Sequence, residues 1–170
     1  VGSLTDNKNQ ALLIDVFYEL KKECCIDEKL VLIGEGKERA RLEEKVKNLG
    51  MEKEIFLLGA KLNPYNYIKD AELYVVTSKE EGFSLTTLEA MTLKTMVIAT
   101  KTDGTREILG EDSQYGKLVE SSKEELKREI LYYLKNREKR RVYEELGYTR
   151  AKDFSKDNAI TKIEEFIDRL

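Results

Sequence analysis

Two glutamates, Glu81 and Glu89, flank a strand-to-helix turn whose composition suits phosphate binding. Residues 72–77 are apolar and rich in β-formers, as in a short buried strand, and helical spacing of apolar residues starts at Leu85. Gly82 lies at the apex of the turn. The first N–H groups of a helix have no partner within it, and the helix dipole favours an anion there. Phosphates held by amides, with carboxylates beside them to accept hydroxyl hydrogen bonds, suit a nucleotide sugar better than a bare nucleotide.

The start of this helix carries recognisable signals. Ser84 has the residue type of an N-cap, and Phe83 and Leu88 then occupy the positions of a hydrophobic staple. The alternative is that Glu81 and Glu89 are ordinary solvated charges, because charged residues make up 37% of the chain. The agreement of loop position, staple and preceding strand favours a site.

The elements that must position this turn alternate along the chain. The pattern predicts strands at 1–2, 30–33, 55–58, 74–76, 97–100 and 116–119, with helices between them. Such alternation indicates an α/β fold with a Rossmann-like parallel sheet of about six strands and helices on both faces. Residues 123–170 are predicted to form a charged helical tail. The inward positions of that tail are Leu126, Ile130, Leu134, Phe154, Ile160, Ile163 and Phe166.

The expected strand order places two loops at one crevice. In the common order 3-2-1-4-5-6, the first and fourth strands are neighbours where the winding reverses, and ligands bind at their carboxyl ends. The loops there are 3–8 and 78–83. Lys8 comes from the first of these loops and could reach a diphosphate bound at the second, although it could also be a surface lysine near a helix start.

Composition limits the function classes. The 170 residues suit one domain, and the net charge of −3 argues against a nucleic-acid partner. Cys24 and Cys25 are adjacent and indicate free thiols in a reducing compartment. The chain has no histidine, the commonest acid–base residue and metal ligand, and no long apolar run or signal peptide, so we expect a soluble protein. Val1 and Gly2 look like the end of a strand, so we expect the natural chain to begin earlier.

The motif and its surroundings resemble those of retaining family-4 glycosyltransferases, the glycosyl transferases group 1. Glu81 and Glu89 have seven residues between them, in the context Ser78-x-x-Glu81-Gly82-Phe83. The likeness runs from Val1 to about Val119. Its other ordered matches are Val1-Gly2-Ser3-Leu4, Lys8-Asn9-Gln10, Leu32-Ile33-Gly34-Glu35-Gly36, Leu57-Leu58-Gly59, Asn63-Pro64-Tyr65, Glu89-Ala90-Met91 and Val97-Ile98-Ala99-Thr100.

The resemblance implies the C-terminal, donor-binding domain of a two-domain GT-B fold. Residues 1–170 would form this single nucleotide-sugar-binding domain, and the N-terminal acceptor domain, with its active-site histidine, would lie outside this chain. The implied activity is metal-independent transfer of a hexose from a nucleotide-diphosphate sugar, with UDP as the preferred guess, to a saccharide or lipid-linked acceptor. The context is similar to bacterial capsule-type members, which implies surface-polysaccharide assembly. The implied location is the cytoplasm, at the inner face of the membrane for the full-length protein. No cofactor is implied.

The resemblance also assigns roles to residues of the motif. It implies that Glu81 contacts the hydroxyls of the donor sugar, and that Glu89 contacts the ribose. The turn at Gly82 then presents the amides that take the diphosphate, whose charge develops as it leaves. These amides belong to Phe83, Ser84 and Leu85.

Two departures from the family pattern concern charge and the helix exit. Lys8 matches a lysine that clamps the diphosphate together with an arginine five residues earlier, but Ser3 stands at that position here. The substitution puts full catalytic competence in doubt, and Arg106 is the candidate replacement. Residues 94–96 are Lys-Thr-Met where similar proteins carry glycine and proline, which affects the exit of the Glu89 helix.

Two further loops are assigned by the resemblance to the neighbourhood of the nucleobase. They contain Gly36 and the pair Ala60 and Lys61. The spacing Gly34-x-Gly36 is weak as a dinucleotide fingerprint, because no third glycine follows, and a tight strand-to-helix turn is the alternative.

Two other functions remain open. The chain could be a degenerate nucleotide-sugar-binding module that lost turnover with its arginine. It could also belong to a nucleotide-sugar epimerase, which shares the two-domain fold.

Overall fold

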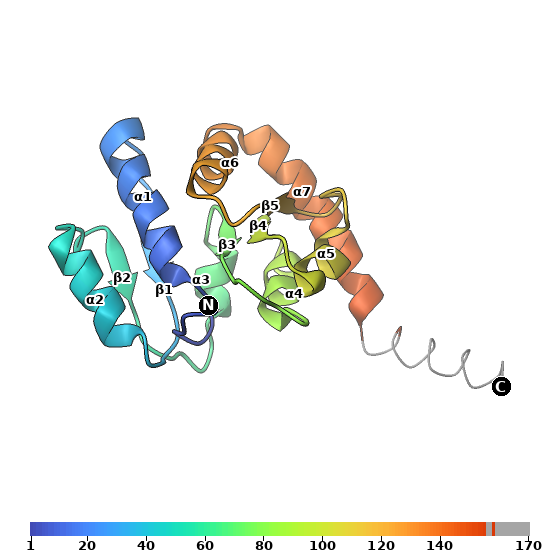
Figure 1. Cartoon of the computed structure of the whole chain (residues 1–170). Coiled ribbons are helices and arrows are strands. Elements are labelled where there is room, and N and C mark those ends of the chain that lie inside the picture. The colour runs from blue at the N-terminus through green and yellow to red at the C-terminus, as the bar shows by residue number, and fades with distance from the viewer. Residues whose placement is uncertain (156–157, 159–170) are drawn as a thin grey trace.

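A computed structural model describes residues 1–155 and residue 158. In this part of the chain, strands and helices alternate as an α/β fold (Figure 1). The elements are α1 Gln10–Cys24, β1 Leu30–Leu32, α2 Arg39–Asn48, β2 Ile55–Leu57, α3 Tyr65–Lys69, β3 Tyr74–Val76, α4 Leu85–Thr92, β4 Val97–Thr100, α5 Asp103–Leu109, β5 Lys117–Val119, α6 Lys123–Lys135, α7 Arg137–Ala151 and the 3₁₀ helix η1 Lys152–Phe154.

All strand pairs among the described residues are parallel, as predicted, but they form two groups. β1 pairs with β2, and β4 lies between β3 and β5. The prediction of about six strands was wrong, because the described residues form five. The expected first strand is an extended segment in which Gly2 N–H donates to the Ile33 carbonyl at 2.9 Å and Leu4 N–H to the Glu35 carbonyl at 2.9 Å.

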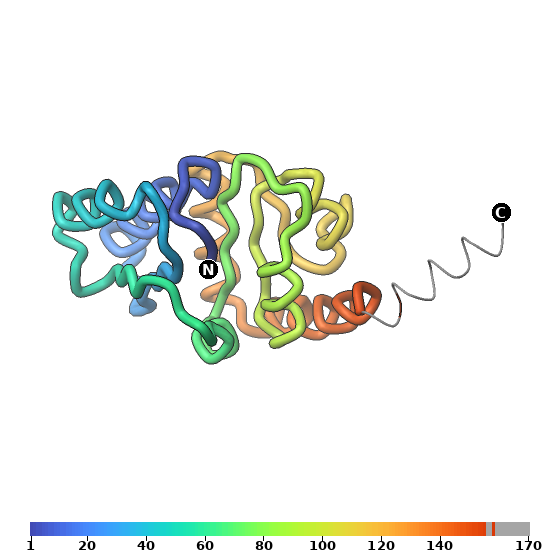
Figure 2. Tube along the Cα trace, turned by 90° about the horizontal axis from the view of Figure 1, so that it is seen from below, coloured from blue at the N-terminus to red at the C-terminus, as the bar shows by residue number. Residues whose placement is uncertain are grey.

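On its other side this first segment has no strand ladder. There the Tyr74 hydroxyl donates to the Val1 carbonyl at 3.2 Å, so the chain start lies between β1 and β3 (Figure 2). The strands and the extended first segment therefore follow the expected order 3-2-1-4-5-6. The first segment itself forms no strand. A cleft of about 630 Å³ separates β1 from β3 and is lined by both strands, α1, α3 and α6.

Each face of the sheet is covered by its own helices. Ile98 of β4 belongs to the core that contains the buried faces of α1, α2 and α6, whereas Val97 and Ala99 pack with α4 and α5. The apolar face of α1 comprises Leu13, Val16, Phe17 and Leu20, which are buried, and Leu12, which is partly buried. Because all four residues of β4 are buried, this strand is the centre of the fold.

Local side-chain contacts shape the starts of two helices. Helix α3 begins at Tyr65 with Pro64 at the N-cap position, and the Asn63 side chain accepts from Tyr65 N–H at 3.2 Å. Asp103 and Gly104 form the first turn of α5. Thr102 is the N-cap of that helix and shares a capping box with Thr105.

The tail is helical as far as it is described. Leu126 and Ile130 of α6 are buried as predicted, and Leu134 is partly buried. Phe154 packs against the core of α4 and α5. The predicted inward residues Ile160, Ile163 and Phe166 lie outside the described residues. No helix in the described part combines the length and the apolarity needed to cross a membrane.

One residue of the basic run 135–141 is buried. The Arg140 side chain is 7% exposed and pairs with Glu72 in the loop before β3. It also donates from Nη1 to the Tyr133 carbonyl at 3.1 Å. Arg140 therefore ties α7 to the end of α6 and to the entry of β3.

We predict that Arg140→Ala lowers the free energy of unfolding by about 1–3 kcal/mol, because the Tyr133 carbonyl loses a charged donor and the arginine stem leaves a gap. The exposed neighbour Lys139 provides the control, since Lys139→Ala should stay within about 0.5 kcal/mol of the parent. Urea unfolding of both variants measures the difference. Equal effects of the two substitutions would contradict the structural role of Arg140.

Candidate functional site

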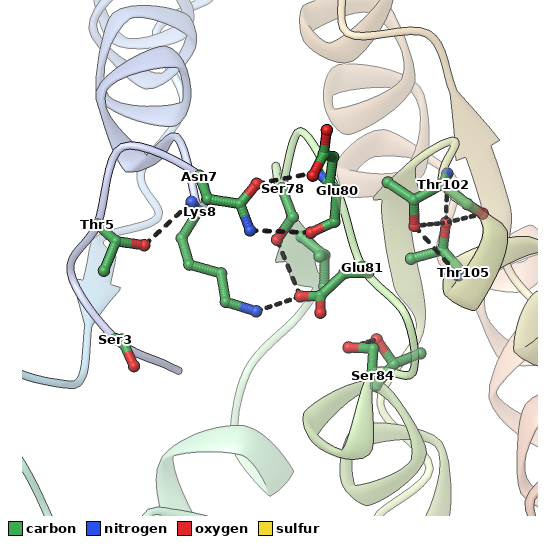
Figure 3. Close-up of polar contacts among 12 residues, drawn as sticks. Ser3, Thr5, Asn7, Lys8, Ser78, Glu80, Glu81, Ser84, Thr102 and Thr105 are labelled. Carbon is green, nitrogen blue, oxygen red and sulfur yellow. Dashed lines mark hydrogen bonds and ion pairs between the residues drawn. The ribbon is translucent and has the colours of Figure 1, made fainter.

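The loops 3–8 and 78–83 meet at the carboxyl ends of the central strands, as predicted (Figure 3). Asn7 links them with its side chain, which donates to the Glu80 carbonyl at 3.0 Å and accepts from Glu80 N–H at 3.1 Å. Lys79 N–H also donates to the Asn7 carbonyl at 2.8 Å. The buried Thr77 hydroxyl donates to the Lys8 carbonyl at 2.9 Å. The first loop is therefore held against the second by both side chains and backbone.

Glu81 is the central side chain of this junction. Its Oε1 forms an ion pair with Lys8 Nζ and accepts from the Ser78 hydroxyl at 3.0 Å. The Glu81 side chain is 10% exposed and that of Lys8 is 30% exposed, so the carboxylate depends on these donors for its solvation. Figure 3 shows the two side chains reaching toward each other from opposite loops. Within the described part of the chain, Glu81 Oε2 accepts no hydrogen bond.

The turn after Glu81 presents a series of free backbone donors. Among the described residues, none of the five amides of 82–86 donates a hydrogen bond to another protein group. Helix α4 follows at once, with Ser84 at the predicted N-cap position. Its hydroxyl does not cap the helix, because it accepts from the Thr87 hydroxyl at 2.8 Å. This arrangement leaves the first-turn amides available to an anion.

Glu89 lies one turn into α4 and is partly exposed. Its Oε1 is 3.5 Å from the hydroxyl of Tyr65, which belongs to α3. Burial of Tyr74 raises the pKa of its hydroxyl to about 12, and the negative charges of Glu89 and Glu81 add to the increase. The charges of Glu81 and Glu89 therefore both favour the neutral form of the buried Tyr74 hydroxyl.

Other residues of the site were not predicted as functional. Asn7 joins the loops, Ser78 holds Glu81 and Tyr65 approaches Glu89. The spacing Ser78-x-x-Glu81 was visible in the sequence as part of the motif, but nothing local to Asn7 or Tyr65 indicates which distant loop each would meet.

Ser3 and Arg106 do not add a cation at Glu81. Ser3 is exposed, and its carbonyl accepts from the Gln10 side chain at 2.9 Å. The Arg106 Nε is 3.9 Å from a carboxylate oxygen of Glu111, at the other end of α5. Arg106 as a replacement for the missing arginine therefore has no support from its contacts.

The loops assigned to the nucleobase lie together. Gly34 N–H donates to the Gly59 carbonyl at 2.9 Å, and Gly36, Ala60 and Lys61 are exposed beyond this contact. A Cβ on Gly36 would overlap the backbone of Leu4, so the tight-turn interpretation of this motif fits the structure. Contact of these loops with a nucleobase stays a prediction.

No group of three or more histidine, cysteine or acidic side chains in the described part of the chain is arranged to hold a metal ion. The charged and polar groups at the junction are instead amides, one lysine and carboxylates. The arrangement can bind an anion and, beside it, hydroxyl groups.

Comparison with known proteins identifies related sequences. The family model described as glycosyl transferases group 1 matches residues 1–150. The N-acetylgalactosamine-N,N'-diacetylbacillosaminyl-diphospho-undecaprenol 4-alpha-N-acetylgalactosaminyltransferase of Campylobacter jejuni is 36% identical over 158 residues, which cover 92% of this chain and 42% of that protein. An uncharacterised glycosyltransferase of Methanocaldococcus jannaschii, MJ1178, is 30% identical and covers 100% of this chain and 47% of its own. The chain thus spans about half the length of these relatives.

Solved structures share the fold. Anabaena Alr3699/HepE in complex with UDP superposes with a TM-score of 0.87 at 23% identity, over 99% of this chain and 47% of that one. The C-terminal domain of the glycosyl transferase group 1 protein LpcC from Francisella tularensis gives a TM-score of 0.78 at 28% identity. That match covers 89% of this chain and 82% of the LpcC domain.

The raised pKa of Tyr74 predicts a loss of stability at alkaline pH. Between pH 10, where the phenol of the unfolded chain ionises, and about pH 12, the folded state keeps a proton that the unfolded state has lost. The free energy of unfolding therefore falls as pH rises, by about 1.4 kcal/mol per pH unit for this group. Tyr74→Phe should remove that share of the slope in chemical unfolding measured from pH 9 to 12. An unchanged slope would show that Tyr74 does not titrate as described.

Proposed function

Because this chain belongs to the glycosyl transferases group 1, we propose that it is the donor-binding half of a retaining, metal-independent glycosyltransferase. In this proposal the enzyme moves a hexose from a UDP-sugar to a saccharide or lipid-linked acceptor. The observation that carries it is the row of free amides at 82–86, placed between Lys8 with Glu81 on one side and Glu89 on the other. An amide row at a helix start suits a diphosphate, and the carboxylates suit hydroxyl groups.

The assignment to the donor half draws on chain length and on one solved domain. The chain spans about half of its relatives, and it covers most of the LpcC C-terminal domain. We propose that an acceptor-binding domain precedes it in the full-length enzyme. Alone, the chain should bind a nucleoside diphosphate weakly and transfer nothing, since it lacks the opposite wall of the cleft.

The geometry gives each group a role in the transfer. The amides of 82–86 would take the diphosphate oxygens and stabilise the negative charge that grows on this leaving group. Lys8, which pairs with Glu81 in the ligand-free structure, would turn toward the diphosphate when the donor binds. Glu81 would then accept hydroxyl hydrogen bonds from the sugar in place of the lost ammonium. Glu89 would accept hydrogen bonds from the ribose.

The nature of the acceptor rests on one relative. The name of the Campylobacter jejuni protein includes a diphospho-undecaprenol acceptor. It also names the transferred group as N-acetylgalactosaminyl, which is a hexosamine. A lipid-linked saccharide acceptor is therefore the proposed class for this chain. The proposed donor sugar is a hexose.

The two glutamates should separate in a binding experiment. Each hydroxyl bond to a charged acceptor is worth roughly 1.5–3 kcal/mol, so Glu89→Ala should weaken UDP and UDP-glucose alike by about tenfold or more. Glu81→Gln should leave UDP affinity nearly unchanged and should remove the extra affinity contributed by the sugar. Calorimetric titration of the 170-residue chain with both ligands measures this, with GDP and ADP as alternative bases and thermal unfolding as the control for folding.

Two results would contradict this arrangement. If none of UDP, GDP and ADP binds at millimolar concentration, the donor-site assignment fails. If Glu81→Gln loses UDP as badly as Glu89→Ala while both remain folded, the sugar and the ribose have been placed wrongly along the motif.

A degenerate binding module is the second candidate, and Ser3 is the observation that favours it. The residue lies on the loop that carries Lys8, so an arginine there would add a second cation beside the amide row. For a working enzyme, we expect that Ser3→Arg in the full-length protein gives no large gain in transfer rate. A large gain in a radiolabel transfer assay would instead favour the degenerate module.

A further inference from the structure

A buried chain of hydroxyl groups connects Glu81 to helix α5 on the far side of the junction from Lys8. The Thr105 hydroxyl donates to the Thr100 carbonyl at 2.7 Å, and the Thr100 hydroxyl donates to the Ser78 carbonyl at 2.6 Å. Ser78 in turn donates from its own hydroxyl to Glu81 Oε1 at 3.0 Å. Thr105, Thr100 and Ser78 are no more than 1% exposed. None of these three residues has a role in the proposed contacts with the donor.

Gly104, in the first turn of α5, contacts the same loop directly. Its N–H donates to the Glu81 carbonyl at 2.8 Å. A Cβ at this position would lie 2.7 Å from both the carbonyl carbon and the oxygen of Gly82, and 2.8 Å from the Glu81 oxygen. These are backbone atoms, so they could yield only if the loop itself moved. The close approach is therefore possible only for glycine.

Helix α5 is held at both ends, which makes it a fixed support. At its start, Thr102 and Thr105 form the capping box, with Thr102 N–H donating to the Thr105 hydroxyl at 2.9 Å. At its end, Arg150 of α7 donates from Nη2 to the Glu107 carbonyl at 2.9 Å. The Arg150 guanidinium also stacks on Phe154, and Phe154 in turn packs against Phe83 with ring centres 5.9 Å apart. The loop is thus bounded by α5 and η1.

We propose that Gly104 is a positioning residue for the donor site: its close packing and its hydrogen bond fix the backbone of 81–82, and thereby the direction of the Glu81 carboxylate and of the amides that follow. The inference rests on the proposed function of that site. It needs no contact between α5 and the donor. A displacement of about 1 Å in a catalytic site can lower the reaction rate by two orders of magnitude. A single methyl group at residue 104 should therefore change donor binding through the backbone of 81–82.

The test compares two glycine substitutions that each bring a new methyl group against packed atoms. In Gly104→Ala the new methyl meets the Glu81–Gly82 backbone. In Gly116→Ala it meets Leu109 Cδ2 at 2.8 Å and the Val97 carbonyl at 3.0 Å, in the core at the start of β5. Both should lower the melting temperature. Only Gly104→Ala should weaken UDP, by about tenfold or more, and abolish the additional affinity of UDP-glucose.

A structural measurement on the ligand-free chain keeps this test separate from the proposed function. In ¹⁵N-correlated NMR spectra, Gly104→Ala should shift the amides of 81–84, and Gly116→Ala should leave them in place. If the parent chain binds no UDP, the proposed function fails while these spectra still decide whether Gly104 positions the loop. Unshifted amides in a folded Gly104→Ala protein, or equal loss of UDP in both variants, would overturn the inference.

Should Gly104→Ala fail to fold, Thr105 supplies the second pair of variants. Thr105→Val removes the hydroxyl that reaches the Thr100 carbonyl, and Thr105→Ser retains it. We expect the valine variant to shift the 81–84 amides and to lose UDP affinity, and the serine variant to restore both. A valine variant that behaves like the serine variant would overturn the inference as well.

Discussion

The junction between the loops 3–8 and 78–83 is the constraint on which the arrangement of the site depends, and the Lys8–Glu81 ion pair is one of several contacts that hold it. The two groups of strands share no ladder in the described residues. Their relative position near the site is therefore set by the loops that carry Lys8 and Glu81. The Asn7 bridge to Glu80 and the Thr77 hydroxyl strengthen the same junction. An opening of this junction would separate the lysine from the amide row and dismantle the anion site as a unit.

This ion pair also explains why the site can exist without a ligand. A carboxylate that is only 10% exposed loses most of its hydration, and that cost is offset only when charged and polar donors replace the water. Lys8 and Ser78 are those donors. A bound diphosphate would compete with Glu81 for the same ammonium, and hydroxyl groups of the donor would then replace it at the carboxylate. In the proposed function, Lys8 and Glu81 therefore exchange partners when the donor binds.

The backbone behind Glu81 is as constrained as its side chain. Gly104 of α5 packs against the loop backbone, while Phe154 of η1 packs on Phe83. The glycine at 104 is therefore a requirement of packing, and its neighbours Thr102 and Thr105 hold the helix that carries it. Support of this kind comes from elements that are distant in sequence from the motif.

Much of the fold could be predicted because it depends on local pattern and general topology. The buried strands, the face of α1, the turn at Gly82 and the meeting of the two loops all follow from apolar spacing and from the parallel strand order. The predicted strand at residues 1–2 is absent because this segment makes only isolated backbone hydrogen bonds, from Gly2 to Ile33 and from Leu4 to Glu35, which do not amount to a ladder. The same reasoning could place Lys8 near Glu81, since strand order alone brings their loops together.

What could not be predicted depends on particular tertiary neighbours. Ser84 lies at the N-cap position, but its hydroxyl oxygen accepts a hydrogen bond from the Thr87 hydroxyl and does not cap the helix. Arg140 is buried within a basic run because Glu72 and the Tyr133 carbonyl face it. Lys94 adopts a left-handed conformation (φ 58°) that glycine would favour, and its ammonium pairs with Glu145 at 2.7 Å. None of these partners is close in sequence to its residue, except Thr87.

The most direct measurement of the central claim is an NMR titration of the ¹⁵N-labelled chain with UDP and, as a matched control, with uridine. If the amide row binds the diphosphate, UDP should shift the backbone signals of 82–86 and of Lys8, and uridine should leave those of 82–86 in place. Shifts confined to other surfaces, or equal shifts of 82–86 with uridine, would contradict the claim that this turn holds the diphosphate of a nucleotide sugar.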